Sequence, residues 1–386
     1  MQSGAADETQ ADVAVVGAGL AGLVCAQRLR QAGLRVVVLE KSRGLGGRLA
    51  TRRLSGTLSG TCADHGVRYL ADQGALTHLL IQTLLQQSLL QPWPTRLEVI
   101  ESGEHSSPKV AYYTAQNGLT VVAKWLAAKL EIWSGQRLQR LTQTEAGWQL
   151  ELEAQFDSPA NSPLLARSVV MAIPAPQALA LLKPLSAELP DLIPAIRSAE
   201  FDPCLTVIAS YPAEPTEAIL PWQAVQLIDH PELSWISLES SKGRDLQIPV
   251  LVVQSTPKFA ALHLEAEDLQ PVGTLLLEQA AATLAANLET ALARDRSQPA
   301  ALQVHRWRYG FVRQPLLERF LSACAPHPLV CSGDWCGGSQ IEAALASGLA
   351  AAAQIERLLN LNSAQSLEAA SPETVFSELM QQLALS

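Results

Sequence analysis

The residues best able to do chemistry lie near the N-terminus. They are the glycines Gly17, Gly19 and Gly22, and Glu40, which follows Gly22 by 18 residues. Glycines at this spacing let the chain turn tightly, bring the backbone close to a pyrophosphate and pack a helix against a strand. The phosphates would lie against the free N–H groups at the helix start, Leu20–Ala21. The Glu40 carboxylate is placed to accept hydrogen bonds from ribose hydroxyls. The pattern therefore predicts a dinucleotide-binding site.

Three elements must position these residues. The short apolar run Val13–Val16 is typical of a strand buried on both faces, and Val36–Glu40 is a second such run. The stretch Leu20–Arg30 between them is expected to be helical. A β-α-β unit that served packing alone would not need three glycines at these positions, so we interpret the unit as a cofactor site.

Two further glycine-rich segments decide between a nicotinamide and a flavin cofactor. Gly47 and Arg48 lie in a Gly-Gly-Arg run after Glu40, where the backbone can pass the pyrophosphate and Arg48 can neutralise it. Far along the chain, Asp334 ends a strand-like segment and would bind a ribityl hydroxyl, while the helix start at Gln340–Ile341 would offer N–H groups to a flavin carbonyl. A nicotinamide-binding domain does not require a second cofactor-binding segment from the C-terminal part of the chain. We therefore predict FAD, held non-covalently because no cysteine or histidine lies in an attachment motif.

Five stretches, in order along the chain, resemble those of the renalase-like flavoproteins. The longest, Glu40–Arg53, reads EKSRGLGGRLATRR and includes Lys41 and Ser42 beside the ribose-binding acid. The others are Ala63–Tyr69 (ADHGVRY), Val170–Gln177 (VMAIPAPQ), His305–Tyr309 (HRWRY) and Gly333–Ala353. The resemblance spans roughly residues 12–359 and points to the wider amine-oxidase-type flavoprotein superfamily.

The resemblance implies an α/β fold in which a Rossmann-type FAD-binding domain is interwoven with a smaller α+β substrate domain, in a p-hydroxybenzoate-hydroxylase-like arrangement. In related flavoproteins the segment matching Leu138 passes the adenine, and Gly66 and Val67 match the flavin edge. The expected division is 11–75, 113–175 and 320–360 for the FAD-binding domain, 76–112 and 176–319 for the substrate domain, and 361–386 for a tail.

The resemblance also implies an activity. It nominates Tyr69 and Trp307 as pocket aromatics, with core packing as the alternative for both, and Gln254 where some relatives carry His. Renalase-like enzymes oxidise the 2- and 6-dihydro isomers of NAD(P): hydride passes to flavin N5, and dioxygen then reoxidises the flavin to give hydrogen peroxide. At Glu239, in the segment that the resemblance places at the roof of the substrate pocket, a Leu-Glu pair replaces the Arg-Asn of bacterial relatives. This departure leaves the substrate, and the choice between NAD and NADP, open.

Two other classes of function stay open. On the same scaffold the chain could be an amine oxidase or a desaturase of an apolar polyene. The lysine near N5 and the aromatic pair expected of an amine oxidase are not identifiable, and neither is the membrane-docking surface expected of a desaturase. A non-catalytic flavin- or NAD(P)H-binding protein is the third hypothesis, which an absence of turnover would favour.

Composition limits the partners and the compartment. The net charge is −9 with no basic stripe, which argues against nucleic acid or an anionic membrane as partner. No apolar run reaches the roughly 18–20 residues of a membrane span, and the polar start is not a signal peptide, so a cytoplasmic protein is expected. The six cysteines lack C-x-x-C spacing and the seven histidines lack metal-ligand spacing, so we predict no metal. Arg52 and Arg53 are either a solvated pair or a means of steering a phosphate-bearing ligand.

Overall fold

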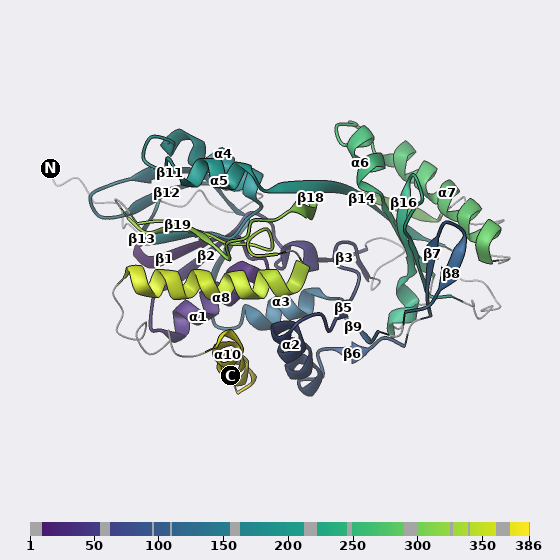
Figure 1. Cartoon of the computed structure of the whole chain (residues 1–386), viewed down its shortest axis with the longest axis horizontal. Helices are drawn as coiled ribbons and strands as arrows, with labels where there is room; N and C mark the ends of the chain where they lie inside the picture. The colour runs from purple at the N-terminus through teal and green to yellow at the C-terminus, as the bar shows by residue number, and fades with distance from the viewer. Residues whose placement is uncertain are drawn as a thin grey trace.

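Two sheets at opposite ends of an elongated molecule organise the chain (Figure 1). We call the parts built on them the Rossmann lobe and the second lobe. The computed structural model describes residues 10–54, 62–94, 96–108, 110–154, 163–211, 222–244, 249–288, 299–324, 327–338, 340–359 and 371–385.

The Rossmann lobe is built on an eight-stranded sheet whose order begins β10-β2-β1-β13. These four strands are parallel to one another; β13 then pairs with β20 in parallel, and with the antiparallel hairpin β12–β11. The apolar runs of β1 and β2 are buried because helices cover both faces of the sheet. The strands are β1 (Gln10–Val16), β2 (Val36–Glu40), β10 (Glu131–Ser134), β11 (Gln136–Gln143), β12 (Trp148–Ala154), β13 (Leu164–Met171), β19 (Leu321–Ala323) and β20 (Leu329–Cys331).

Helices form a layer on each face of this sheet (Figure 1). On one face α1 (Leu20–Gln31), α2 (Ala75–Gln86), α3 (Thr120–Leu126), α8 (Gln340–Leu358) and α10 (Pro372–Ala384) share one apolar core. On the other face α4 (Ala175–Leu182) and α5 (Leu192–Arg197) pack into a second core. None of the helices in the described ranges combines the length and apolar character that crossing a lipid bilayer requires.

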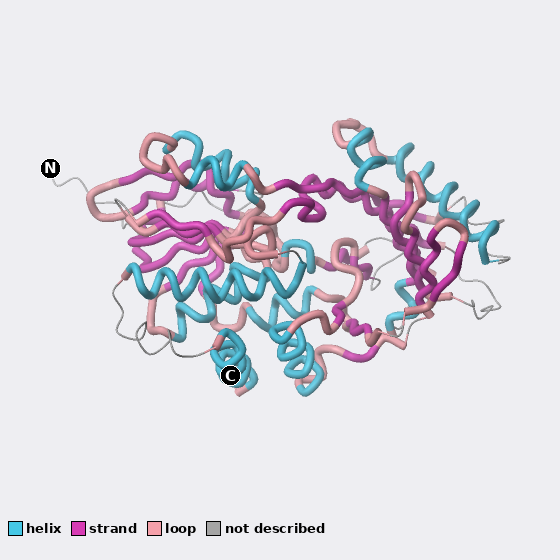
Figure 2. Tube along the Cα trace, viewed as in Figure 1, coloured by secondary structure: helices cyan, strands magenta, loops and turns pink. Residues whose placement is uncertain are grey.

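The second lobe is built on a seven-stranded mixed sheet in the order β18-β14-β17-β16-β15-β7-β8. Helices α6 (Pro257–His263) and α7 (Gln270–Leu288) bury their apolar residues against one face of it. The long strands β14 and β18 reach back toward the Rossmann lobe, as Figure 2 shows. The strands are β7 (Leu97–Glu101), β8 (Glu104–Ser106), β14 (Glu200–Ser210), β15 (Ala224–Leu227), β16 (Leu233–Leu238), β17 (Val250–Ser255) and β18 (Ala301–Gln314).

The described residues also form two small sheets and three short 3-10 helices. Strands β3 (Thr51–Arg53) and β4 (Cys62–Asp64) form a hairpin, and β5 (Leu70–Ala71), β9 (Tyr112–Thr114) and β6 (Gln91–Pro92) form a three-stranded sheet. The 3-10 helices are η1 (Gly47–Leu49), η3 (Lys183–Leu185) and η4 (Glu239–Lys242).

The architecture confirms the predicted fold class, a Rossmann-type domain interwoven with a smaller α+β domain. The packing of individual helices differs from the expected division at three places. Within 76–112 and 176–319, assigned to the substrate domain, α2, α4 and α5 bury their apolar faces in the cores of the Rossmann lobe. Within 361–386, expected to be a tail, α10 buries Phe376, Leu379, Met380 and Leu383 in the first of those cores.

Candidate functional site

The turn from β1 into α1 has the shape that a pyrophosphate requires. Gly17 has a φ of +108°, and a Cβ there would lie 2.6 Å from the Ala172 carbonyl oxygen. A Cβ at Gly22 would overlap the Gly17 carbonyl oxygen, so this glycine lets the helix pack closely against the strand. By contrast, nothing lies within 4 Å of a Cβ built at Gly19, and the first turn of α1 has neither a capping side chain nor an acidic residue. Open space therefore lies before uncapped N–H groups, including those of Leu20 and Ala21.

Glu40 ends β2 beside this turn. Its carboxylate accepts hydrogen bonds from the backbone N–H of Ala18 (3.0 Å) and of Ser42 (2.8 Å), which hold it at the end of the strand. A carboxylate accepts about four hydrogen bonds, so two lone pairs are left for ribose hydroxyls. Lys41 and Ser42 are exposed immediately after it. The residues at this end thus fit the ribose and pyrophosphate of a dinucleotide.

Leu138, the predicted adenine contact, lies in β11 with its side chain in the core of the lobe. The turn that leads into β11 is tied to the cofactor end, since the Gly135 N–H donates to the Ser42 carbonyl. With its side chain in the core, Leu138 could contact an adenine only through its backbone.

Arg48 and Asp334, expected to serve the cofactor separately, bind one another. Their Nη2 and Oδ1 atoms are 2.6 Å apart, and Arg48 also donates to the Gly310 carbonyl oxygen at 3.3 Å. The Gly-Gly-Arg loop reaches this place because the Gly46 N–H donates to the Ala18 carbonyl, which brings Gly47 alongside Gly19. The ion pair therefore joins the N-terminal cofactor loop to the turn before α8. At the start of that helix, Gln340 has a φ of +69° and Ile341 is partly buried.

The segment from His65 to Arg68 gathers the other predicted residues. Trp307 Nε1 donates to the His65 carbonyl oxygen at 2.9 Å, and Gln254 Nε2 donates to the Gly66 carbonyl oxygen at 2.9 Å. Gly66 admits no side chain, because a Cβ there would overlap the Arg48 carbonyl oxygen, and the neighbouring Val67 N–H donates to that same oxygen. The structure thus brings Gly66, Val67, Gln254 and Trp307 together beside Arg48.

Gln254 has no side-chain atom free for a substrate. It is buried, its amide nitrogen holds the Gly66 carbonyl, and its amide oxygen accepts from Arg68 Nε at 2.6 Å. These contacts make it a positioning residue for the 65–68 backbone rather than part of the pocket surface.

Tyr69 lies one step away, in an aromatic cluster with Tyr112, Trp93 and Trp235. The ring centroids are 4.5, 6.2 and 5.7 Å from that of Tyr69, respectively. The Arg68 guanidinium lies 4.6 Å from the centre of the Trp235 ring and connects the cluster to Gln254. Tyr69 is thus partly buried against core aromatics but keeps an accessible portion, so both core packing and a role as a pocket aromatic fit its position.

Two histidines adjoin Trp307: His65, which from the sequence we interpret as a turn residue rather than a general base, and His305, which the sequence interpretation did not single out. The His65 and His305 rings lie 5.1 and 4.3 Å from the Trp307 ring and 4.6 Å from each other. Burial, His305 and Arg52 lower the pKa of His65 to about 3, and burial and Arg52 lower the pKa of His305 to about 4. Within the described residues, His65 Nδ1 is buried without a hydrogen-bond partner. The site therefore presents neutral imidazoles at physiological pH.

The Glu239 stretch is where the structure corrects the sequence interpretation. Glu239 is not at a substrate-facing surface: it is fully buried, bonded to Lys242 Nζ at 2.7 Å and to Arg244. Asp64 completes this buried charge cluster through Arg244 and through Lys242 at 3.5 Å. Burial acts to raise the pKa of Asp64, but Lys242, Arg244 and a hydrogen bond from Thr51 outweigh it and lower the pKa. The sequence shows equal numbers of acidic and basic residues at these positions, two of each, which is consistent with their pairing in a buried cluster.

In the part of the chain that the structure describes, no three His, Cys, Asp or Glu side chains gather where they could hold a metal ion.

Several solved structures of oxidases share this fold. A putative protoporphyrinogen oxidase from Exiguobacterium superposes with a TM-score of 0.65 at 14% identity, over 92% of this chain and 100% of the other. Putrescine oxidase bound to putrescine gives 0.63 at 14% identity, over 91% and 100%. Cyclohexylamine oxidase from Brevibacterium oxydans gives 0.60 at 14% identity, over 91% and 99%. At these identities the likeness shows the fold.

Among curated proteins, Lysine-specific histone demethylase 1 homolog 1 of Arabidopsis thaliana is 48% identical over 63 residues. The matched stretch is 16% of this chain and only 7% of the length of that protein.

Family models match both parts of the chain. The NAD(P)-binding Rossmann-like domain matches residues 15–87, and the flavin containing amine oxidoreductase family matches residues 100–356. The second match covers more than half of the chain and confirms the prediction of an FAD-dependent oxidoreductase. The chain therefore belongs to the flavin containing amine oxidoreductase family.

Proposed function

We propose that the protein is a renalase-like oxidase that takes hydride from 2- and 6-dihydro isomers of NAD(P) and gives NAD(P)+ and hydrogen peroxide. The supporting observation is the meeting of Trp307, two neutral histidines and the Gly66 backbone at one place. Planar, uncharged groups suit a dihydropyridine ring, which releases hydride without first losing a proton to a base. In balance, the reduced dinucleotide, dioxygen and one proton give the oxidised dinucleotide and hydrogen peroxide.

Non-covalently bound FAD would supply the two-electron chemistry, accepting hydride and passing electrons to dioxygen. Gly19, the α1 N–H groups and Glu40 would hold its ribose and pyrophosphate, and Asp334 its ribityl chain. The residues of this chain orient the substrate: Trp307 is fixed by its bond to the His65 carbonyl, and Gln254 holds the backbone that would border the flavin. Tyr69 would form the pocket wall toward Trp235.

The test is anaerobic mixing of the FAD-loaded protein with 6-dihydro-NAD and 6-dihydro-NADP, while the visible flavin absorbance is recorded. We expect rapid bleaching, then recovery with release of peroxide when air is admitted, and the faster of the two dinucleotides is the preferred substrate. A flavin that stays oxidised with both isomers and with ordinary NAD(P)H would refute the proposal and favour a binding role.

The Trp307→Phe variant sharpens this test because it removes the hydrogen bond to the His65 carbonyl but keeps an aromatic ring. The loss of one such bond should slow flavin reduction by about tenfold. Trp133→Phe is the matched control, since the Trp133 Nε1 donates to Glu131 of the same strand, β10. Equal rates of flavin reduction in both variants would show that Trp307 does not line the substrate pocket.

Oxidation of a small amine is the second candidate, favoured by the family to which the chain belongs. Lys242 is tied to Asp64 and Glu239 in the buried cluster, so it is not free to serve as the lysine that an amine oxidase places near N5. Putrescine and cyclohexylamine are suitable probes in the same anaerobic experiment. Bleaching by either amine, with no response to the dihydro isomers, would assign the protein to this second function.

A further inference from the structure

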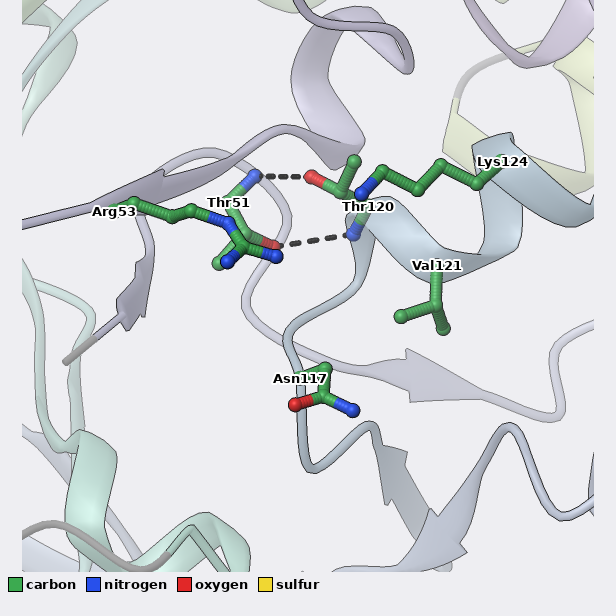
Figure 3. A pocket seen from close by; sticks show the side chains of 6 residues that line it. All are labelled: Thr51, Arg53, Asn117, Thr120, Val121 and Lys124. Carbon is green, nitrogen blue, oxygen red and sulfur yellow. Dashed lines mark hydrogen bonds between the residues drawn. The ribbon is translucent and has the colours of Figure 1, made fainter. Parts of the chain in front are cut away.

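A pocket of about 340 Å³ lies between β3 and α3, apart from the residues predicted to hold the flavin. Figure 3 shows its lining: Thr51, Arg53, Asn117, Thr120, Val121 and Lys124. Arg52, the residue between Thr51 and Arg53, points to the other face of the strand, where its Nε donates to Gln303. The pocket therefore uses one of the two adjacent arginines and not the other.

The wall of the pocket is held by reciprocal hydrogen bonds between β3 and α3. The Thr51 N–H donates to Thr120 Oγ1 at 2.6 Å, and the Thr120 N–H donates to Thr51 Oγ1 at 3.1 Å, as drawn in Figure 3. A Cβ at Gly118 would overlap the Thr51 side chain, so the loop before α3 packs directly on the strand. Thr51 Oγ1 donates in turn to Asp64, which anchors the wall to the buried charge cluster. The pocket is thus a preformed feature of the fold.

The charges that face the pocket are of one sign. Arg53 and Lys124 extend from β3 and α3 toward the same space (Figure 3), and no carboxylate is among the lining residues. Within the described residues neither side chain takes part in an ion pair, although the whole chain carries a net charge of −9. Both side chains are exposed, so an anion from solvent can reach them, and an anion bound between them would offset the repulsion of the two like charges.

We propose that this pocket is an anion site that takes the phosphate group of a small molecule. An Arg guanidinium binds two phosphate oxygens at once, a Lys ammonium adds a point charge, and the Asn117 amide adds a neutral donor. The volume is at the lower end of the range for small-molecule sites, about 300–1,000 Å³, so a phosphate with a small attached group fits better than a whole dinucleotide. The phosphate can come from free inorganic phosphate or from a nucleotide such as the 2′-phosphate end of NADP.

The test is a phosphorus NMR titration of the FAD-loaded protein with inorganic phosphate, in wild type and in Arg53→Gln and Lys124→Gln variants. Each variant should bind phosphate about tenfold more weakly, the loss expected for one charge-assisted hydrogen bond. Arg52→Gln is the matched control, with the same charge change on the opposite face of β3, and should bind as wild type does. Wild type that does not bind phosphate, or an equal loss in Arg52→Gln, would overturn the proposal.

Competition distinguishes the two sources of phosphate. Displacement of phosphate by NADP+ but not by NAD+, abolished by Arg53→Gln, assigns the site to a nucleotide phosphate. Phosphate binding that neither dinucleotide displaces assigns it to inorganic phosphate. The inference does not depend on the proposed oxidase reaction, because flavin bleaching and phosphate binding are measured separately and each can fail alone.

Discussion

At the scale of single residues, the most informative feature is the pair of neutral imidazoles beside Trp307. A folded-state pKa of about 3 for His65 and about 4 for His305 compares with an ordinary value of 6.5. Between these values the unfolded chain binds protons that the folded protein does not. The contribution of the two histidines to stability is therefore fully present above about pH 6.5 and is lost as the pH falls toward 4.

We accordingly expect the urea midpoint of the protein to fall between pH 7.5 and pH 5, and His305→Asn to weaken this dependence on pH. Equilibrium unfolding at a series of pH values measures it. His105 on β8 is exposed, so His105→Asn should leave the slope as in wild type. A His305→Asn slope indistinguishable from that of wild type would show that His305 is not held neutral by the fold.

At the scale of elements, the close packing of α1 on α8 positions the turn that carries Asp334. A Cβ at Gly348 would lie 2.5 Å from the Ala21 carbonyl oxygen, so the two helices touch through backbone at this point. Ser347, its neighbour, accepts a hydrogen bond from the Gly333 N–H at 3.0 Å and thereby connects the helix contact to the Asp334 turn.

Gly348→Ala should destabilise the protein by about 1–3 kcal/mol through overpacking. The roughly 1 kcal/mol that alanine gains over glycine within a helix would not offset this cost. Urea unfolding is the measurement, and Ala353→Ser on the exposed side of α8 is the control of similar size change. A Gly348→Ala protein more stable than wild type would mean that α8 can move away from α1 without cost.

At the scale of the whole molecule, the buried charge cluster joins segments that are far apart in the chain. Asp64 follows the first cofactor loop, whereas Glu239, Lys242 and Arg244 belong to the second lobe, and the Asp64 N–H also donates to Glu239 at 2.9 Å. The cluster contains two acids and two bases, so removing one partner leaves a buried charge without compensation.

Arg244→Met should therefore cost about 3–5 kcal/mol of stability, which equilibrium unfolding in urea will measure. Arg308→Met is a suitable control, because Arg308 pairs with Glu265 at the exposed surface, where ion pairs contribute little. If both substitutions lowered the free energy of unfolding by the same small amount, the buried charge cluster would not stabilise the contact between β4 and η4.

The sequence by itself determined the β-α-β unit and the cofactor class, because the signals are local. A strand, a turn with three glycines, a helix and a terminal acid occupy consecutive residues, and their geometry follows from backbone sterics and from the burial of short apolar runs. The family match confirms the oxidoreductase class that these signals indicated.

Only the tertiary structure decided which distant residues meet. The Arg48–Asp334 pair spans 286 residues, and the contact of Gln254 with Gly66 spans 188, so both depend on how the strands of the two sheets align. Glu239 shows the physical reason most clearly. From the sequence, Glu239 was expected at the roof of the substrate pocket. The burial of a charge depends on its partners, however, and only folding brings Asp64, 175 residues away in the chain, to the arginine that it shares with Glu239.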